Sequence, residues 1–238
     1  MIAVATAKRR ICTICARGGS KGVPNKNLRT VAGKPLITHT LGHALDAGIF
    51  DVIAVSSDSQ AILDVARAHG AHELVERPAE LASDTAPKVP AIRHAVRTIE
   101  ERHGVRFDVC CDLDATAPLR TAEDVRSAVE LLERRGVKNV FSVVPARRSP
   151  YFNLVEVNPD GVARLSKTLE RPVFRRQDAP ACFDINGSVY VWHRDALDLA
   201  DTVFLDDTAV YVMGHRSAFD IDHEVDLKIV ELLLKERP

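Results

Sequence analysis

The chain of 238 residues has few aromatic side chains, little net charge and no long apolar run. Aromatic residues make up 5% of it, and 32 Lys and Arg nearly balance 33 Asp and Glu, which gives a formal net charge of -1. Proteins that bind nucleic acids or membrane surfaces generally carry a marked positive charge. No run is long enough to predict a membrane-spanning helix. We therefore expect no nucleic-acid or membrane partner, and a site for an anion must be local.

Cysteine is scarce as well, with five residues in the chain. Cys12 and Cys15 have C-x-x-C spacing, but they lie in an apolar run that predicts a strand, where residues three apart point to opposite faces. The remaining cysteines are an adjacent pair, Cys110 and Cys111, and the distant Cys182. Such a set does not provide a zinc site. The pattern favours buried, unpaired thiols in a cytosolic protein.

Residues 1–10 include the cationic Lys8, Arg9 and Arg10, but the apolar stretch after them is too short for the core of a signal peptide and lacks a plausible cleavage region. We therefore expect a cytoplasmic protein.

Apolar runs alternate with amphipathic segments through most of the chain. Strands are predicted at 11–16, 51–56, 107–114, 139–144, 188–192 and 209–213. Helices are predicted near 36–48, after 57–59, near 89–103, 121–135 and 194–200, and after 219–226. This alternation predicts an α/β fold with a mainly parallel sheet flanked by helices. Ligands are then expected outside the carboxyl ends of the strands.

Residues 145–187 interrupt this alternation. They contain a hairpin-like run, 151–157 and 162–165, followed by a cationic loop at 171–176. A long excursion from an α/β core typically covers a site or forms an interface. We expect one domain, 1–238, with 145–187 as a small β-rich inserted subdomain that serves as a lid or in homodimerisation.

The loop after the first strand has the composition of a phosphate site. Glycines in residues 17–27 let backbone N–H groups approach an anion, and Arg17, Lys21 and Lys26 add positive charge. The loop is not a dinucleotide fingerprint, which requires glycine at position 17, and Pro35 after Gly33-Lys34 excludes a Walker A loop. A surface turn with solvated charges is the alternative interpretation.

Two pairs of carboxylates follow strand-like segments. Asp112 and Asp114 end the strand at 107–114, and Asp220 and Asp222 precede the last helix. Carboxylates so placed suit a hard cation such as Mg²⁺ that bridges protein and phosphate. Alternatively, one member of each pair caps a loop or helix or pairs with a cation.

Four motifs in order, 16–27, 77–85, 116–120 and 220–222, resemble those of the acylneuraminate cytidylyltransferase family, the CMP-sialic acid synthetases. Segments 11–15, 112–114, 144–148, 150–154 and 219–222 make the chain most similar to bacterial family members that activate legionaminic acid. Asp114 stands where the sialic-acid enzymes commonly have Gln, and Asp184 where they often have Arg.

The resemblance implies a Rossmann-like, GT-A-like nucleotidyltransferase fold. It implies transfer of CMP from CTP to the anomeric hydroxyl of a nine-carbon α-keto acid sugar, with Mg²⁺ as cofactor and pyrophosphate as product. Legionaminic acid or a derivative such as N,N'-diacetyllegionaminic acid is the expected substrate, and Neu5Ac, Kdn or Kdo is the alternative. The resemblance also implies a homodimer, or a higher assembly, whose excursion reaches the partner's site. A non-catalytic nucleotide-sugar binding module is a further alternative.

Roles follow from the resemblance and from position. The catalytic cations would be Lys26, Arg17 and Lys21, with Lys26 at the α-phosphate. The nucleotide would contact Arg17, Gly18, Ser20, Lys21, Asn27, Arg77, Lys88 and Asn186. The sugar would contact Asp114, Thr116, Arg176, Gln177, Tyr190 and Phe204, although both aromatic residues also suit a plain core role. Asp220 and Asp222 would hold Mg²⁺.

Overall fold

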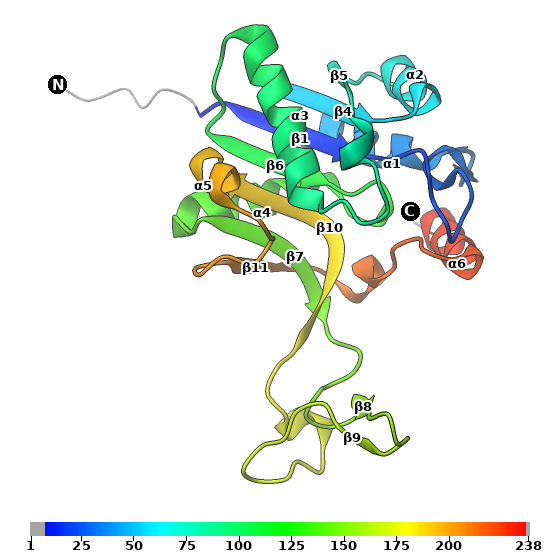
Figure 1. The fold of residues 1–238 in the computed structure, drawn as a ribbon, viewed down its shortest axis with the longest axis vertical. Helices are drawn as coiled ribbons and strands as arrows, with labels where there is room; N and C mark the ends of the chain where they lie inside the picture. Colours follow the sequence, from blue (N-terminus) through cyan, green and yellow to red (C-terminus); the bar gives the residue numbers. More distant parts are fainter. Residues whose placement is uncertain (1–7, 237–238) are drawn as a thin grey trace, which may run out of the picture.

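The computed structural model describes residues 8–236, so only residues 1–7 of the segment considered for a signal peptide lie outside it. A seven-stranded sheet in the order β11-β7-β10-β6-β1-β4-β5 forms its centre (Figure 1). The strands are β1 (Arg10–Cys15), β4 (Val52–Ser57), β5 (Glu73–Glu76), β6 (Val109–Leu113), β7 (Asn139–Pro145), β10 (Phe183–His193) and β11 (Ala209–Val212). Only β10 runs antiparallel to its neighbours, β6 and β7. The predicted mainly parallel sheet is confirmed.

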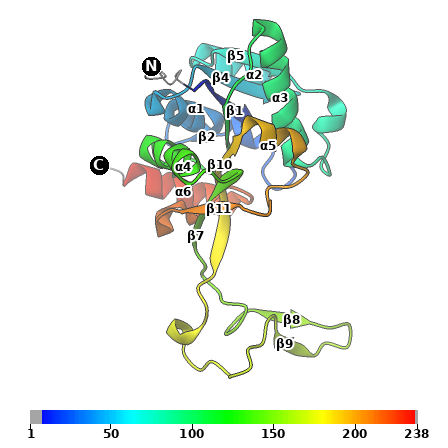
Figure 2. The same ribbon diagram turned by 90° about the vertical axis from the view of Figure 1, so that its left-hand side faces the viewer.

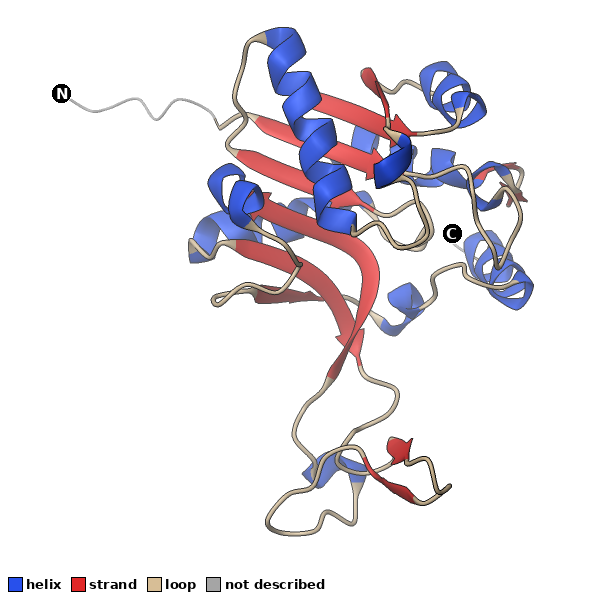
Figure 3. Cartoon of the chain, viewed as in Figure 1, coloured by secondary structure: helices blue, strands red, loops and turns tan. Residues whose placement is uncertain are grey.

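Helices cover both faces of the sheet (Figures 2 and 3). They are α1 (Leu36–Ala47), α2 (Gln60–Ala68), α3 (Lys88–His103), α4 (Ala122–Arg135), α5 (Arg194–Leu199) and α6 (Glu224–Lys235). Alternate residues of β1 explain the two layers: Cys12 and Ile14 pack with α1, α2 and α4, whereas Ile11 packs with α3 and α5. Because the parallel strands are buried on both faces, they read as continuous apolar runs in the sequence.

Three short strands were not predicted. The edge strand β5 has four residues, of which only Val75 is buried, so it lacks an apolar run. The hairpin of β2 (Thr30–Val31) and β3 (Lys34–Pro35) has two residues in each strand. β5 pairs with β4, and the long segment 77–87 follows β5 and leads into α3.

The excursion extends from one end of the sheet as a separate arm (Figures 1 and 2). It leaves after β7 and returns in β10, and it holds the predicted hairpin as β8 (Val155–Val157) and β9 (Ala163–Leu165). Several apolar side chains of the arm are exposed, among them Phe174 at 84%. Its predicted role in dimerisation or as a lid stays a prediction.

All five cysteines are unpaired. Within residues 8–236, none of the helices combines the length and the apolar character that crossing a membrane requires.

Candidate active site

A cavity of about 470 Å³ opens where the predicted motifs meet, beside the carboxyl ends of β1 and β6. The loop after β1, the segment before α3, the turn after β6 and the segment before α6 all line it. Of the predicted site residues, the structure brings together Arg17, Ser20, Lys21, Lys26, Asn27, Arg77, Lys88, Asp114, Thr116, Asp220 and Asp222. Motifs separated by some two hundred positions in the sequence thus form one site.

Internal hydrogen bonds hold the loop after β1 in shape. The hydroxyl of Ser20 donates to the carbonyl of Val23 at 2.5 Å and accepts from the backbone N–H of Lys26 at 3.1 Å. Asn25 adopts a left-handed conformation, with φ of 52°, immediately before the short 3-10 helix η1 (Lys26–Leu28). This turn directs the side chain of Lys26 toward the segment before α6.

Lys26 links the two halves of the site. Its ammonium donates to the carbonyl of Ile221 and lies 3.0 Å from a carboxylate oxygen of Asp222. The backbones also meet closely, because a Cβ on Gly22 would lie 2.0 Å from the carbonyl oxygen of Asp222. The cation predicted for the α-phosphate and a carboxylate predicted for the metal are therefore neighbours.

The other loop cations face an acidic residue that sequence reasoning did not single out. Asp84, in the segment before α3, pairs with Lys21 at 2.5 Å and with Arg17 at 2.6 Å. Hydrogen bonds from these two cations lower the pKa of Asp84. An incoming triphosphate would meet Arg17 and Lys21 already grouped around one carboxylate.

Buried polar groups complete the nucleotide side. Arg77 donates to the hydroxyl of Ser56 at 3.2 Å and to its carbonyl at 2.8 Å. Asn27 donates to the carbonyl of Arg17 at 3.0 Å, while its own Oδ1 is buried with no hydrogen-bond partner among the described residues. An unpaired buried acceptor that lines a cavity suits a ligand N–H or O–H group. Gly18 does not line the cavity, and its N–H donates to Asp58 at 2.8 Å.

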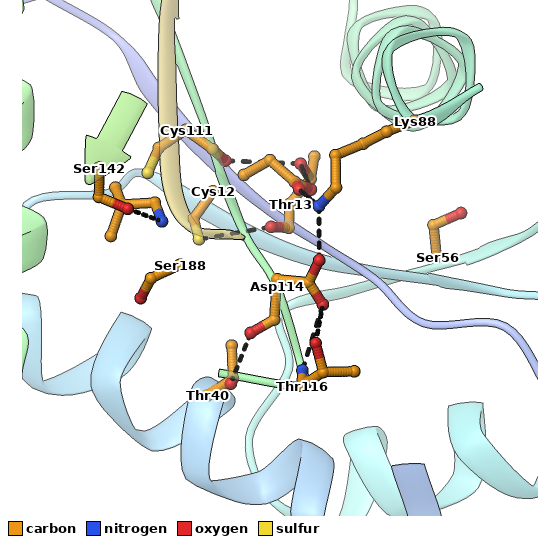
Figure 4. A network of polar contacts seen from close by, with 12 residues as sticks. Cys12, Thr13, Thr40, Ser56, Lys88, Cys111, Asp114, Thr116, Ser142 and Ser188 are labelled. Atoms are coloured by element: carbon orange, nitrogen blue, oxygen red, sulfur yellow. Dashed lines mark hydrogen bonds and ion pairs between the residues drawn. The ribbon is translucent and has the colours of Figure 1, made fainter. Parts of the chain in front are cut away.

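Lys88 and Asp114 line the opposite side of the cavity, and Lys88 also contacts the buried carboxylate of Asp112. The ammonium lies 3.1 Å from Asp112 and 2.9 Å from Asp114, which Figure 4 shows reaching toward it from the turn after β6. Asp112 is fully buried and accepts from the hydroxyl of Thr13 at 2.8 Å. The other oxygen of Asp114 accepts from the N–H of Thr116 at 3.1 Å and from its hydroxyl at 3.0 Å.

These contacts keep Asp114 and Lys88 charged. Burial alone would raise the pKa of Asp114, but the Lys88 ammonium and the Thr116 hydrogen bonds outweigh it and lower this pKa to about 2. Burial likewise works to lower the pKa of Lys88, and the charges of Asp112 and Asp114 outweigh it, so this pKa lies well above its ordinary value. Asp114 is therefore an ionised acceptor at neutral pH.

Arg120, at the end of the 116–120 motif, holds the turn after β6 in place through hydrogen bonds. It is fully buried and donates to the hydroxyls of Ser188 at 2.9 Å and Thr40 at 2.8 Å, and to the carbonyl of Asp114. Burial lowers the pKa of Arg120 to about 10, which still leaves it charged. Sequence reasoning gave it no role, although a charged residue inside an otherwise small and apolar motif was the available signal.

Asp220 and Asp222 are the carboxylates at which the cavity could hold Mg²⁺. Burial, followed by the charges of Asp222 and Asp114, raises the pKa of Asp220, so negative charges crowd here in a way that a cation would relieve. Within residues 8–236 no group of three or more His, Cys, Asp or Glu could hold a metal ion. Magnesium commonly takes one or two carboxylates and completes its shell with water and substrate phosphates. The pair fits that pattern.

Other predicted residues lie apart from the cavity. The side-chain amide of Asn186 forms hydrogen bonds within the protein: it donates to the carbonyl of Ser217 at 2.9 Å and accepts from the hydroxyl of Ser142 at 2.7 Å. Tyr190 is nearly buried, with its ring centroid 4.7 Å from the Lys88 nitrogen. Phe204 packs edge-on against Phe141 at 5.5 Å and is largely exposed. The predicted roles of these three residues stay predictions.

The last two predicted sugar contacts are in the arm. Arg176 and Gln177 belong to the 3-10 helix η3 (Arg176–Asp178), which the arm carries away from this chain's own cavity (Figure 1). Asp184 accepts from the backbone N–H of Arg147 at 3.0 Å at the base of the arm.

Comparison with known proteins gives consistent matches over nearly the whole chain. A family model described as cytidylyltransferase matches residues 11–233. The post-translational flagellin modification protein B of Campylobacter coli is 43% identical over 227 residues, which are 95% of each chain. The CMP-N,N'-diacetyllegionaminic acid synthase of Campylobacter jejuni is 43% identical over 224 residues, 94% of each chain.

A solved structure agrees on the fold. It is a CMP:2-keto-3-deoxy-manno-octonic acid synthetase complexed with CTP, which superposes with a TM-score of 0.70 over 96% of this chain and 99% of that one, at 18% identity.

Proposed function

The chain belongs to the cytidylyltransferase family, as an enzyme that transfers CMP from CTP to an acid sugar, and we propose that this sugar is legionaminic acid or a derivative such as N,N'-diacetyllegionaminic acid. The anomeric hydroxyl attacks the α-phosphorus of CTP and pyrophosphate leaves. The observation that carries the proposal is one cavity with a cationic loop on one side and ionised Asp114 on the other, in a chain 43% identical to a synthase of that product.

We propose that the cationic side binds the nucleotide. Arg17 and Lys21 would exchange Asp84 for the outer phosphates, and Lys26 would neutralise charge that develops at the α-phosphorus. Asn27, Ser20 and Arg77, which line the cavity, would hold the nucleoside and the loop. Phosphoryl transfer requires little covalent help from a protein, so alignment and charge neutralisation account for most of the catalysis. Gly18 and Asn186 would act by supporting this surface.

Asp220 and Asp222 would hold Mg²⁺, which supplies positive charge to the triphosphate when it is bound. Lys26, near the end of the loop, pairs with Asp222, so it would contact the same phosphates. Asp222 is more exposed than Lys26, which makes its carboxylate the more accessible partner of that ion pair.

The proposed assembly is a homodimer formed through the arm. Its support is the exposed apolar surface of β8, β9 and the following loop, which includes Val155, Val157 and Phe174. In such a dimer Arg176 and Gln177 would reach the partner's cavity, where Arg176 would meet the sugar carboxylate or a phosphate. The cytoplasm is the proposed location, where CTP is available and five unpaired cysteines are stable.

Pyrophosphate release from CTP and Mg²⁺ with a panel of acid sugars tests the proposed substrate. We expect the highest kcat/KM with N,N'-diacetyllegionaminic acid. Equal or higher kcat/KM with Neu5Ac, Kdn or Kdo would reject the legionaminate preference. Binding of CTP without turnover of any acid sugar would support a non-catalytic nucleotide-sugar binding module instead.

A further inference from the structure

Asp84 is a carboxylate held between two cations of the loop after β1. Its Oδ1 lies 2.6 Å from the guanidinium of Arg17, and its Oδ2 lies 2.5 Å from the ammonium of Lys21. All three residues line the cavity. A phosphate group presents the same arrangement to two such cations, because its neighbouring oxygens each accept a charge-assisted hydrogen bond. The carboxylate of Asp84 therefore takes the place that a phosphate group would take between Arg17 and Lys21.

The segment 77–87 that carries Asp84 is anchored at its ends and not in its middle. Arg77 is buried and donates to β4, and Lys88, the residue after the segment, pairs with a buried carboxylate of β6. Residues 83–85 between them are exposed. Among the described residues, the side-chain hydrogen bonds and ion pairs that join residues 83–85 to other segments are those of Asp84. These contacts can therefore be exchanged without breaking a buried contact.

The two ion pairs of Asp84 are also open to water. The side chain of Lys21 is 81% exposed and that of Asp84 is 43% exposed. Exposed ion pairs are weak, so a triphosphate, which carries more negative charge, displaces the carboxylate. Asp84 is nevertheless ionised at neutral pH, because hydrogen bonds from Lys21 and Arg17 lower its pKa. It is thus a permanent but weak competitor for both cations.

A competitor within the protein lowers the affinity for every ligand that needs the same cations. The apparent affinity falls with the fraction of molecules in which the two cations are free to bind a ligand. For CTP this loss is offset by contacts with the nucleoside. Pyrophosphate has no nucleoside and depends on the cations alone, so the competition weighs most on the product.

We propose that Asp84 competes with pyrophosphate for Arg17 and Lys21 and so promotes release of this product. Transfer of CMP leaves the two outer phosphates as pyrophosphate, still paired with these cations. When a cation separates from a pyrophosphate oxygen, the carboxylate is near enough to replace that oxygen. Asp84 acts through the two cations and not on the reacting atoms, so it is a positioning residue. The inference rests on the proposed function, in which Arg17 and Lys21 hold the outer phosphates.

The test compares Asp84→Asn with Glu80→Gln, two losses of one negative charge from the same segment. Glu80 belongs to the 3-10 helix η2 (Ala79–Leu81), is exposed and does not line the cavity. Calorimetry without sugar gives the dissociation constants of magnesium pyrophosphate and of CTP with Mg²⁺. We expect Asp84→Asn to bind both ligands about 3- to 10-fold more tightly, as for the loss of two exposed ion pairs that compete with the ligand. Glu80→Gln should change each constant less than about twofold.

A double-mutant cycle separates competition from a general effect of charge. In a Lys21→Met background one of the contested cations is already absent. The gain in pyrophosphate affinity from Asp84→Asn should then be at least about twofold smaller than in wild type. A general gain from removing a negative charge near the cavity would be the same in both backgrounds, and this result would reject the proposal.

Steady-state kinetics gives the corresponding readout during turnover. The inhibition constant of pyrophosphate should be about 3- to 10-fold lower for Asp84→Asn than for wild type, while kcat does not rise. Weaker or unchanged binding of pyrophosphate by folded Asp84→Asn, or equal tightening by Glu80→Gln, would show that Asp84 does not compete for the cations. Since calorimetry needs no sugar, absence of turnover of every acid sugar by the wild-type enzyme would instead reject the proposed function.

Discussion

Lys26 and Asp222 are the two residues on which the proposed chemistry depends most. Lys26→Ala and Asp222→Ala should each lower kcat about 10²- to 10³-fold, because each removes a charge that acts on the reacting phosphates. Lys34→Ala, a loss of an exposed lysine in the β3 strand, is the matched control and should keep wild-type rates. Pyrophosphate release measures the rate of each variant, and circular dichroism shows whether each variant is folded. Near wild-type rates in folded Lys26→Ala would remove Lys26 from catalysis.

Asp114 should also stabilise the fold in a pH-dependent way. Its pKa is lowered from 3.8 to about 2, so the unfolded chain binds the proton more tightly than the folded one. Its contribution, about 2 kcal/mol at 1.4 kcal/mol per pH unit, is present above pH ~4 and is lost as the pH falls through about 2.

Denaturant unfolding at several pH values measures this contribution. Wild type should exceed Asp114→Asn in free energy of unfolding at pH 7, and the difference should shrink steadily below pH ~4. A difference that stays constant down to the acid limit would mean that the ion pair with Lys88 does not stabilise the fold.

Individual residue types were predictable, but their pairings were not. The cations and carboxylates that line the cavity stand out in the sequence because they follow strands. Lys88 and Asp112 belong to α3 and β6, whose contact depends on tertiary packing, so their ion pair could not be read from the chain. The hydrogen bonds of the Asn186 amide with Ser142 and Ser217 likewise depend on tertiary packing and could not be predicted from the sequence.

At the scale of elements, the loop after β1 depends on its close contact with the segment before α6. Gly22→Ala should place a methyl group against the carbonyl of Asp222, which a Cβ would approach to 2.0 Å. The two segments must then separate, which displaces Lys26 from Asp222. We expect a loss of kcat/KM of at least about tenfold, since small displacements of aligned groups are costly.

Gly42→Ala on α1 is the matched control, because a Cβ at Gly42 also meets nothing within 4 Å and this glycine lies outside the loop. It should retain wild-type kcat/KM and thermal stability. Equal activity of Gly22→Ala and Gly42→Ala would show that the contact with Asp222 is not needed.

The arm can be removed with little disturbance of the sheet. Pro145 and Phe183 are register partners in β7 and β10, so a short Gly-Ser turn can replace residues 146–182. The shortened chain should fold with a Tm within a few degrees of wild type and be monomeric in light scattering. Because Arg176 and Gln177 are removed, its KM for the acid sugar should rise. A shortened chain that is still dimeric would place the interface elsewhere.

The strands that the sequence predicted are those with continuous apolar runs, such as β1 and β6. The edge strand β5 was missed because its single buried residue, Val75, gives no pattern. The direction of β10 was not predicted either. It is set by the arm, which returns the chain beside the end of β7, so that β7 and β10 pair antiparallel.

At the scale of the whole molecule, charge is divided across one cavity in a chain with almost no net charge. The loop after β1 faces it with Arg17, Lys21 and Lys26, and the opposite side presents Asp114 beside Asp220. A triphosphate fits the cationic side of this division, and we propose that the enzyme transfers the CMP part of CTP to the anomeric oxygen of a legionaminic acid derivative in preference to other acid sugars.

A competition assay tests that claim most directly. Wild-type enzyme, CTP and Mg²⁺ are mixed with equal concentrations of N,N'-diacetyllegionaminic acid, Neu5Ac and Kdn, and the CMP-sugars formed in the first few per cent of turnover are separated by mass. We predict that CMP-N,N'-diacetyllegionaminic acid is the main product, followed by CMP-Neu5Ac and then by the Kdn product. Formation of all three in equal amounts, or of CMP-Neu5Ac or the Kdn product in excess, would contradict the account.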